Sequence, residues 1–108
     1  TRSYLMLDFS HDREADVDWL SGAAICVRGE ALGQTGGWDE DYFMYCEDVD
    51  LCYCLKQKNW RRVYVPEAQI THRIGGSSDW VQGTTIRRHH RAMLQYYLKH
   101  NARGIRVL

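Results

Sequence analysis

The sequence has no long apolar run and almost no proline. None of its hydrophobic stretches approaches the roughly 20 residues that a membrane-spanning helix needs. Pro66 is the only proline among 108 residues, and the chain begins with neither Met nor the apolar segment of a secretory signal. With 44% hydrophobic and 26% charged residues, we predict a soluble globular chain of one domain at most, excerpted from a longer protein.

The cysteines lack the spacing of a zinc site. No two of Cys26, Cys46, Cys52 and Cys54 enclose the two-residue gap of a zinc knuckle. On a helix, Cys52 and Cys54 would point about 200° apart. The alternative of two disulfides has no secretory signal to support it. We therefore expect four reduced thiols.

A net charge is also missing, because 14 acidic residues balance 14 basic ones. The two signs are nevertheless separated along the chain. Residues 1–54 carry 12 of the acids and three bases, a net charge of −9, and residues 55–108 carry the opposite charge of +9. We expect the two parts to attract each other and the basic part to attract phosphates, and we expect no nucleic-acid partner.

Residues 36–55 are the most unusual stretch. They open with Gly36 and Gly37, which favour a tight turn. They then combine six carboxylates with five aromatic rings: Asp39, Glu40, Asp41, Glu47, Asp48 and Asp50, and Trp38, Tyr42, Phe43, Tyr45 and Tyr53. Carboxylates repel one another and aromatic rings favour burial, so this density indicates a functional site rather than a purely structural segment.

A helix is predicted over residues 47–58, ending near Asn59 as a left-handed cap. Its positions 48, 51, 52 and 55 share one face, which places Asp48 on the inward side of the first turn. The positive end of the helix dipole would keep that carboxylate ionised, as a base or a cation ligand must be. The simpler alternative is that helices favour acidic residues at their start.

The other elements are predicted from shorter patterns. We expect residues 10–18 to form a polar loop, residues 22–27 a buried strand, and residues 30–34 a helical turn. Residues 61–65 and 69–71 are predicted as strands around a turn at Pro66, residues 73–83 as a mobile loop, and residues 86–101 as a helix capped by Thr84 or Thr85. The first turns of this last helix carry three cations, Arg87, Arg88 and Arg91. They form either a solvated face or a surface that binds diphosphate or anionic lipid headgroups.

Several motifs follow one another in a specific order. They are Trp19-Leu20-Ser21-Gly22-Ala23-Ala24, Arg28, Gly36-Gly37-Trp38-Asp39-Glu40, Phe43-Met44-Tyr45, Glu47-Asp48-Val49-Asp50-Leu51-Cys52, Val65-Pro66 and His72. Over roughly residues 17–80 this set resembles the C-terminal half of a family-2 glycosyltransferase of the rhamnosyltransferase-like kind. The resemblance implies an α/β fold, the C-terminal portion of a GT-A fold, with a short mixed sheet and two main helices.

The resemblance also implies roles for individual residues. Asp48 would be the catalytic base of an inverting transfer from a nucleotide-sugar to an acceptor hydroxyl. Glu47 and Asp50 would support or cap it, and Gly22 and Ala23 would lie beside the donor. The acceptor side would be lined by Trp38, Asp39, Glu40, Phe43 and Tyr45. From the residues alone, core packing is the better interpretation for any single one of Trp38, Phe43 and Tyr45, and tight packing is as good an interpretation for Gly22 and Ala23.

His72 is predicted to end an inward-facing row that begins at Ala68 and Ile70. The resemblance implies that a histidine at this distance after the base completes a divalent-cation site. Hard oxygen ligands favour Mg²⁺ or Mn²⁺, and one histidine favours Mn²⁺ slightly. The alternative is a structural histidine in the core or at a sheet edge.

One departure from the family pattern is large. The nucleotide-binding N-terminal half and its Asp-x-Asp motif are absent, so we expect the isolated chain to be inactive and to self-associate, through an unpaired edge at residues 22–27. The implied partners are a nucleotide-sugar and a sugar or lipid-linked acceptor, in the cytoplasm or at the inner face of its membrane, which the C-terminal basic helix would contact. The rival interpretations are a non-catalytic interaction module and a two-metal phosphoesterase.

Overall fold

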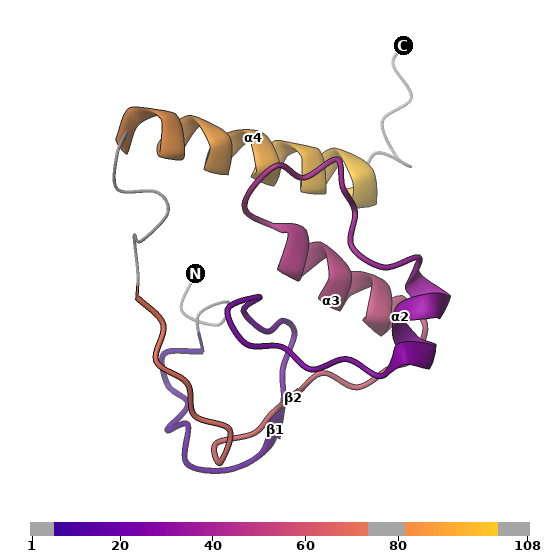
Figure 1. Ribbon diagram of the computed structural model, residues 1–108, viewed down its shortest axis with the longest axis vertical. Coiled ribbons are helices and arrows are strands. Elements are labelled where there is room, and N and C mark those ends of the chain that lie inside the picture. The colour runs from indigo at the N-terminus through magenta and orange to yellow at the C-terminus, as the bar shows by residue number, and fades with distance from the viewer. Residues whose placement is uncertain (1–5, 74–81, 102–108) are drawn as a thin grey trace.

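The computed structural model describes residues 6–73 and 82–101, which form a small mixed α/β arrangement (Figure 1). The elements in chain order are β1 (Ala15–Asp16), α2 (Gly29–Thr35), α3 (Glu47–Gln57), β2 (Val63–Tyr64) and α4 (Gln82–Asn101). In Figure 1, α3 occupies the middle of the molecule, with α2 beside its C-terminal end, the two strands below it and α4 above it. Where we expected a mixed sheet with two main helices, the described residues form a two-stranded antiparallel sheet and three helices.

The sheet is antiparallel and short. Ala15 pairs with Tyr64 and Asp16 with Val63, and the Val17 N–H extends the ladder by donating to the Arg62 carbonyl at 2.9 Å. The predicted strand at residues 61–65 is thus confirmed only at its centre. The predicted loop at residues 10–18 contains β1, which its polar composition did not indicate.

Both α2 and α3 end at the residues that the sequence predicted. Gly36, at φ 81°, follows α2, and the N–H of Gly37 returns to the Leu32 carbonyl at 3.0 Å. Asn59, at φ 62°, follows α3, and the N–H of Trp60 returns to the Leu55 carbonyl at 2.9 Å. Each end is a Schellman motif, in which a left-handed residue lets the next N–H satisfy a carbonyl of the last turn.

The small core joins α2 to α3. Ala31 of α2 packs with Leu51 and Leu55 of α3, and the partly buried side chains around them are Val27, Leu32 and Trp60. Leu51, Cys52 and Leu55 are all buried, which confirms the predicted inward face of α3. In α4, the buried side chain is Ala92.

Several predicted elements are wrong. Residues 22–27 form a turn and an irregular segment, because the nearby N–H groups of Leu20 and Gly22 donate to side chains of α3 and not to a neighbouring strand. The edge that we expected to drive self-association is therefore not there. Residues 69–71 form no strand, and α4 begins at Gln82, so Thr84 and Thr85 lie inside the helix. Most of the predicted mobile loop, residues 74–81, lies outside the described residues.

The acidic residues of the first part of the chain form ion pairs with the basic residues of the second part in the folded molecule. Several ion pairs among the described residues join an acid before residue 55 to a base after it, including Arg61–Asp16 at 2.9 Å, Lys56–Asp18 at 3.1 Å, Lys99–Asp39 at 2.6 Å and Lys99–Asp50 at 2.8 Å. The predicted attraction between the two parts is confirmed. All four cysteines are free thiols, as expected. Within the described ranges, no helix has the length and apolarity to cross a bilayer.

Candidate functional site

The candidate site begins at the sharp start of α3. Tyr45 and Cys46, at φ 72° and 65°, both adopt the left-handed conformation, which is rare for side chains of this kind. This turn makes Glu47 the first helical residue and places Asp48 in the first turn, as the sequence predicted. Helix starts leave backbone N–H groups without partners, so a carboxylate is favoured there.

The carboxylate of Asp48 is held by two backbone N–H groups. Its Oδ2 accepts from Gly22 at 2.8 Å and its Oδ1 accepts from Val49 at 2.8 Å. A carboxylate oxygen has two lone pairs, so each oxygen can accept one further hydrogen bond. A Cβ atom at Gly22 would lie 3.4 Å from the Asp48 Cβ and 3.6 Å from its Oδ2. The structure thus brings Gly22 and Asp48 together, and Asp48 is the group that approaches the glycine closely.

The contact between Gly22 and Asp48 belongs to a regular pattern. Along α3, Asp48, Cys52 and Lys56 follow one another at four-residue intervals. They contact Gly22, Leu20 and Asp18 in that order: the N–H of Leu20 donates to the Cys52 Sγ at 3.4 Å, and Lys56 pairs with Asp18. Four helical residues advance about 6.0 Å and two extended residues about 6.6 Å, so the two periods match. Residues 18–22, which we call the extended segment, therefore run antiparallel to α3, and these contacts fix the position of Gly22.

Asp50 is surrounded quite differently and is only 2% exposed. Its Oδ1 accepts from the Tyr42 hydroxyl at 3.3 Å and lies 2.6 Å from the His100 Nε2. Its Oδ2 accepts from the Lys99 Nζ at 2.8 Å, and Lys99 also donates to Asp39 at 2.6 Å. We expected Asp50 to support Asp48. It instead connects α3 to the last turn of α4, because two residues along a helix turn a side chain by about 200°.

The pKa values around Asp50 follow from these contacts. Burial lowers the pKa of Lys99, but its hydrogen bonds to Asp39 and Asp50 outweigh burial and raise that pKa above its ordinary value of 10.5. The hydrogen bond from Lys99, followed by the one from the Asp41 N–H, lowers the pKa of Asp39 below 3.8. Burial and the charge of Asp50 raise the pKa of Tyr42. The cluster thus holds charged Lys99 against its carboxylates and keeps Tyr42 protonated.

The residues predicted to line the acceptor side are dispersed. Asp39 is paired with Lys99, and Glu40 is exposed. Phe43 is 79% exposed with the Arg88 guanidinium 4.8 Å above its ring, and Tyr45 meets His89 edge-on at 5.3 Å. These contacts connect the loop before α3 to the first half of α4.

Core packing is the wrong interpretation for Trp38 and Phe43, which are both exposed. The buried aromatic side chain of this loop is Tyr42. Its hydroxyl has a partner in the interior, the Asp50 carboxylate, whereas the loop leaves the rings of Trp38 and Phe43 at the surface.

The described residues do not assemble a cation site around Asp48. The one group of three candidate ligands found in residues 6–73 and 82–101 is Asp50, Cys54 and His100, whose ligand atoms lie within 4.8 Å of one another. The Lys99 ammonium already binds Asp50 there. Next to Asp48, the Glu47 Oε2 is buried without a hydrogen-bond partner, which provides one acceptor oxygen.

His72 does not lie where the sequence placed it. Ala68, Ile70 and His72 are all exposed, so the predicted inward-facing row is wrong. Without a strand at residues 69–71, the alternation of side chains has no sheet face to follow. Ala23 is also exposed, and its N–H donates to the Ser21 Oγ at 3.3 Å.

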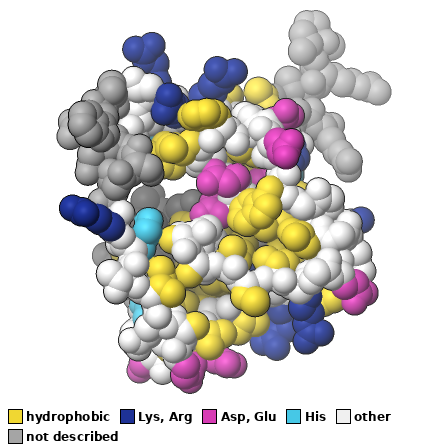
Figure 2. Space-filling view, in the orientation of Figure 1, with side chains coloured by type: hydrophobic (Ala, Val, Ile, Leu, Met, Phe, Trp, Pro, Cys, Tyr) yellow, Lys and Arg dark blue, Asp and Glu magenta, His cyan; other side chains and the backbone are white. Residues whose placement is uncertain are grey.

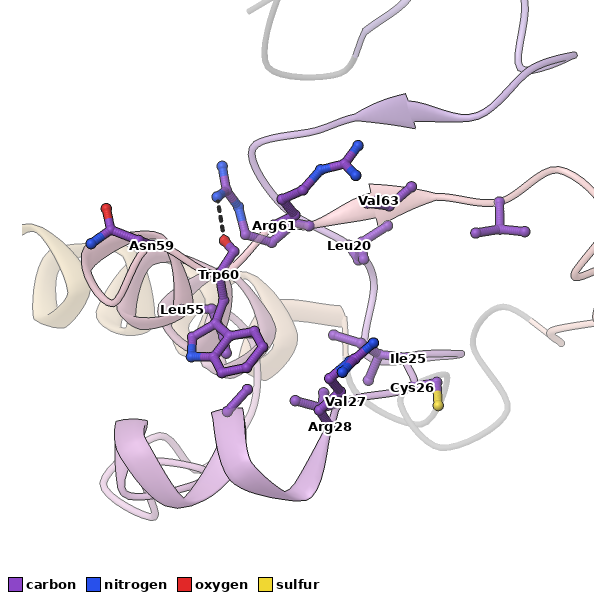
Figure 3. A pocket seen from close by; sticks show the side chains of 13 residues that line it. Leu20, Ile25, Cys26, Val27, Arg28, Leu55, Asn59, Trp60, Arg61 and Val63 are labelled. Atoms are coloured by element: carbon purple, nitrogen blue, oxygen red, sulfur yellow. Dashed lines mark hydrogen bonds between the residues drawn. The ribbon is translucent and has the colours of Figure 1, made fainter.

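A separate groove of about 580 Å³ lies between α2, the end of α3 and β2 (Figure 3). Its walls include Ile25, Val27 and Trp60, and Figure 3 shows Arg28 and Arg61 along it. The Nε of Arg62, another lining residue, is buried without a hydrogen-bond partner. None of the residues predicted from the sequence as functional lines this groove.

Sequence reasoning missed the partners of Asp50. Tyr42, Lys99 and His100 come from two segments separated by more than forty residues, and no local spacing connects them. The available signal was electrostatic. A buried carboxylate at the start of an acidic helix needs a cation beside it, and the last turn of α4, which contains no Asp or Glu, supplies Lys99.

Known proteins resemble this chain over most of its length. The sequence profile described as "Glycosyltransferase like family 2" matches residues 2–106. An N-acetylglucosaminyl-diphospho-decaprenol L-rhamnosyltransferase of Mycobacterium tuberculosis is 44% identical over 79 residues, which are 73% of this chain and 26% of the relative. The rhamnosyltransferase WbbL of Escherichia coli K12 is 43% identical over 56 residues, 52% of this chain and 21% of the relative.

The chain therefore spans about a quarter of the length of the curated relatives it matches. No solved structure matches it.

Proposed function

The chain belongs to glycosyltransferase-like family 2, and on that premise we propose that it is the acceptor-side part of an inverting sugar transferase with a GT-A fold. Asp48 would take the proton of the acceptor hydroxyl while that oxygen attacks the anomeric carbon of a nucleotide-sugar. The bond to the nucleoside diphosphate would break in the same step. As a single partial domain, the chain would supply the base and the acceptor side, and the nucleotide-binding part would lie elsewhere.

The observation that carries this proposal is the fixed position of Asp48. Two N–H donors at 2.8 Å orient its carboxylate, one from α3 itself and one from the segment that the resemblance places beside the donor. A general base must be held in a productive geometry, and hydrogen bonds of this kind provide it. Asp50, in contrast, has its oxygens bound by Tyr42, Lys99 and His100 and is unsuited to take a proton from a substrate.

The relatives suggest the class of substrate. One of them is named for L-rhamnosyl transfer to a diphospho-decaprenol carrying N-acetylglucosamine. We propose a nucleotide-activated deoxyhexose as donor and a lipid-linked sugar as acceptor for the enzyme that contains this chain. Such an acceptor would be met in the cytoplasm at the inner face of its membrane.

A divalent cation, Mg²⁺ or Mn²⁺, remains part of the proposal for the larger enzyme only. The described residues provide no complete site for it, so His72 would contribute one ligand and residues outside this chain the others. In a hybrid enzyme, in which this chain replaces the matching segment of the mycobacterial relative, we expect His72→Ala to raise the Mn²⁺ concentration needed for half-maximal transfer. His90→Ala, on the exposed face of α4, is the control. An unchanged metal requirement would leave His72 without a metal role.

The same hybrid enzyme tests the proposed function. It is incubated with a nucleotide-activated L-rhamnose and a polyprenyl-diphospho-N-acetylglucosamine, and the lipid product is separated and quantified. We expect transfer by the hybrid and none by the isolated chain, which lacks the nucleotide-binding part. A hybrid that folds and binds the donor but transfers no sugar would contradict the proposal and would favour a non-catalytic interaction module.

A further inference from the structure

The longest helix is packed with its apolar side outward. The side chains of α4 that contact the rest of the molecule are small, basic or aromatic: Ala92 is buried, His100 and Lys99 bind Asp50, and Tyr96 meets Tyr53 edge-on at 6.1 Å. The large apolar side chains of α4 are about half exposed or more: Ile86, Met93, Leu94, Tyr97 and Leu98.

The exposed side chains form one continuous face. Residues 86, 93, 94, 97 and 98 follow the three- and four-residue spacing that places side chains on the same side of a helix. The inward contacts at positions 92, 96, 99 and 100 follow the same spacing on the opposite side. Figure 2 shows hydrophobic and basic side chains together along the upper edge of the molecule, over α4. We call the five outward side chains the α4 face.

The charged side chains of α4 itself all have one sign. The sequence of α4 contains no Asp or Glu. Arg91 is exposed one helical turn before Leu94 and two before Leu98, and Arg87 is exposed two turns before Leu94. In a symmetric pair of α4 helices, neither copy would supply a carboxylate from α4 to pair with the arginines of the other, because α4 contains no Asp or Glu. A surface that is apolar inside and negatively charged at its boundary is the chemical complement of this face.

We propose that the α4 face is a membrane-contact surface. Its apolar side chains would enter the boundary between headgroups and acyl chains of an anionic bilayer, with α4 in the plane of the surface and Arg87 and Arg91 among the headgroup phosphates. The biological role of this contact rests on the proposed function, because membrane binding through the α4 face would bring the candidate site to a lipid-linked acceptor. The inference itself does not depend on sugar transfer for its test.

The test is co-sedimentation of the full chain with vesicles, with either phosphatidylglycerol-containing or pure phosphatidylcholine membranes. We expect binding to the anionic vesicles that weakens with salt. Met93→Gln/Leu94→Gln should weaken this binding by about tenfold per side chain, and Arg87→Gln/Arg91→Gln by about fivefold per arginine. The matched control for the apolar variants is Ile70→Gln, because Ile70 and Leu94 are both 59% exposed. The control for the arginine variants is Arg13→Gln. Neither control should change vesicle binding. Circular dichroism of each variant checks that the helices are intact.

Several results would overturn the inference. Absence of binding to anionic vesicles is one, and equal losses in the α4 variants and in the controls are another. Unchanged binding by Met93→Gln/Leu94→Gln would show that the face does not enter the bilayer. If the chain did not bind vesicles but sedimented as a dimer, and Leu94→Gln dissociated that dimer, the α4 face would be an interface with a second copy of the chain. Because no assay of transfer enters this experiment, its failure would leave the proposed sugar transfer standing.

Discussion

Asp48 and Asp50 lie two residues apart in the same helical turn, yet their surroundings are opposite. Asp48 accepts from two N–H groups and keeps lone pairs for a further partner, whereas Asp50 is buried among Tyr42, Lys99 and His100. The turn of the helix separates the two side chains, so one turn provides both a carboxylate that is open to a further hydrogen bond and a carboxylate that connects two helices.

At this scale we predict that Asp48→Asn lowers the rate of transfer by the hybrid enzyme by about 10²–10⁴-fold, because a general base is lost. Donor affinity should stay nearly the same, since the substitution preserves the shape and the hydrogen bond to Gly22. Steady-state rates and donor titrations measure the two effects. Asp12→Asn, on an exposed loop, is the control. Near-normal turnover by a stable Asp48→Asn enzyme would remove Asp48 from its proposed role.

A second residue-scale prediction concerns the glycine that meets Asp48. A Cβ at Gly22 would lie in contact with Asp48, and the γ-methyl groups of Gly22→Val would reach its carboxylate. We expect this variant to fold and to lose roughly 10²-fold in rate, the order expected for a displaced catalytic group.

Gly33→Ala is the matched control for Gly22→Val, because nothing lies within 4 Å of a Cβ at Gly33. It should keep the rate and add about 0.5–1 kcal/mol of stability inside α2. If Gly22→Val retained the full rate, the contact with Asp48 would have no role in positioning.

At the scale of elements, α3 is the centre of the fold because three of its sides contact other parts of the molecule. One face packs on α2, the row of Asp48, Cys52 and Lys56 binds the extended segment, and Asp50 holds the last turn of α4. The other described contacts of α4 include ring contacts with Phe43, Tyr45 and Tyr53, and Ala92 is buried. The attachment of α4 therefore depends on the Asp50 cluster and on the loop before α3.

We predict that Asp50→Asn destabilises the chain by about 2–4 kcal/mol, because it removes one partner of a buried charge cluster and leaves Lys99 without its full complement. Asp18→Asn also removes a carboxylate that pairs with a lysine, but its exposed pair should contribute less than about 1 kcal/mol. Urea unfolding of both variants gives the comparison. Equal, small losses would show that the cluster does not hold α4.

At the scale of the whole molecule, the opposite charges of the two parts act through defined pairs. Because hydrogen bonds from Arg61 and Lys99 lower the pKa values of Asp16 and Asp39 below 3.8, each carboxylate stabilises the folded chain while it is ionised. That contribution is fully present above 3.8 and is lost as the pH falls through the lower folded-state values. The raised pKa of Lys99 adds stability that is complete below 10.5 and is lost above it.

We therefore predict that the free energy of unfolding falls on the acid side of 3.8. Lys99→Met should make the acid-side decrease shallower, because the largest cause of the lowered pKa of Asp39 is then removed and the folded-state pKa lies closer to 3.8. Urea unfolding across the pH range measures both curves, and Arg13→Gln is the control that leaves these pairs intact. An acid-side curve that Lys99→Met does not alter would contradict the assignment.

The features that depend on neighbouring residues could be predicted from the sequence. The positions of α2 and α3, their ends at Gly36 and Asn59, the inward face with Leu51 and the first-turn place of Asp48 all follow from local propensity and helical period. The ordered motifs also predicted the family.

How distant segments meet could not be predicted from the sequence and is visible in the folded chain alone. Residues 22–27 have the composition of a strand, but the segment that leads into them, from Asp18 to Gly22, binds the side chains of α3, and the row ending at His72 has no sheet to follow. The Asp50 cluster unites residues from the loop, α3 and the last turn of α4, and the apolar side of α4 faces outward because its other side carries the groups that Asp50 needs. Such pairings depend on which partners compete for each backbone and charged group, and a local pattern contains no information about those partners.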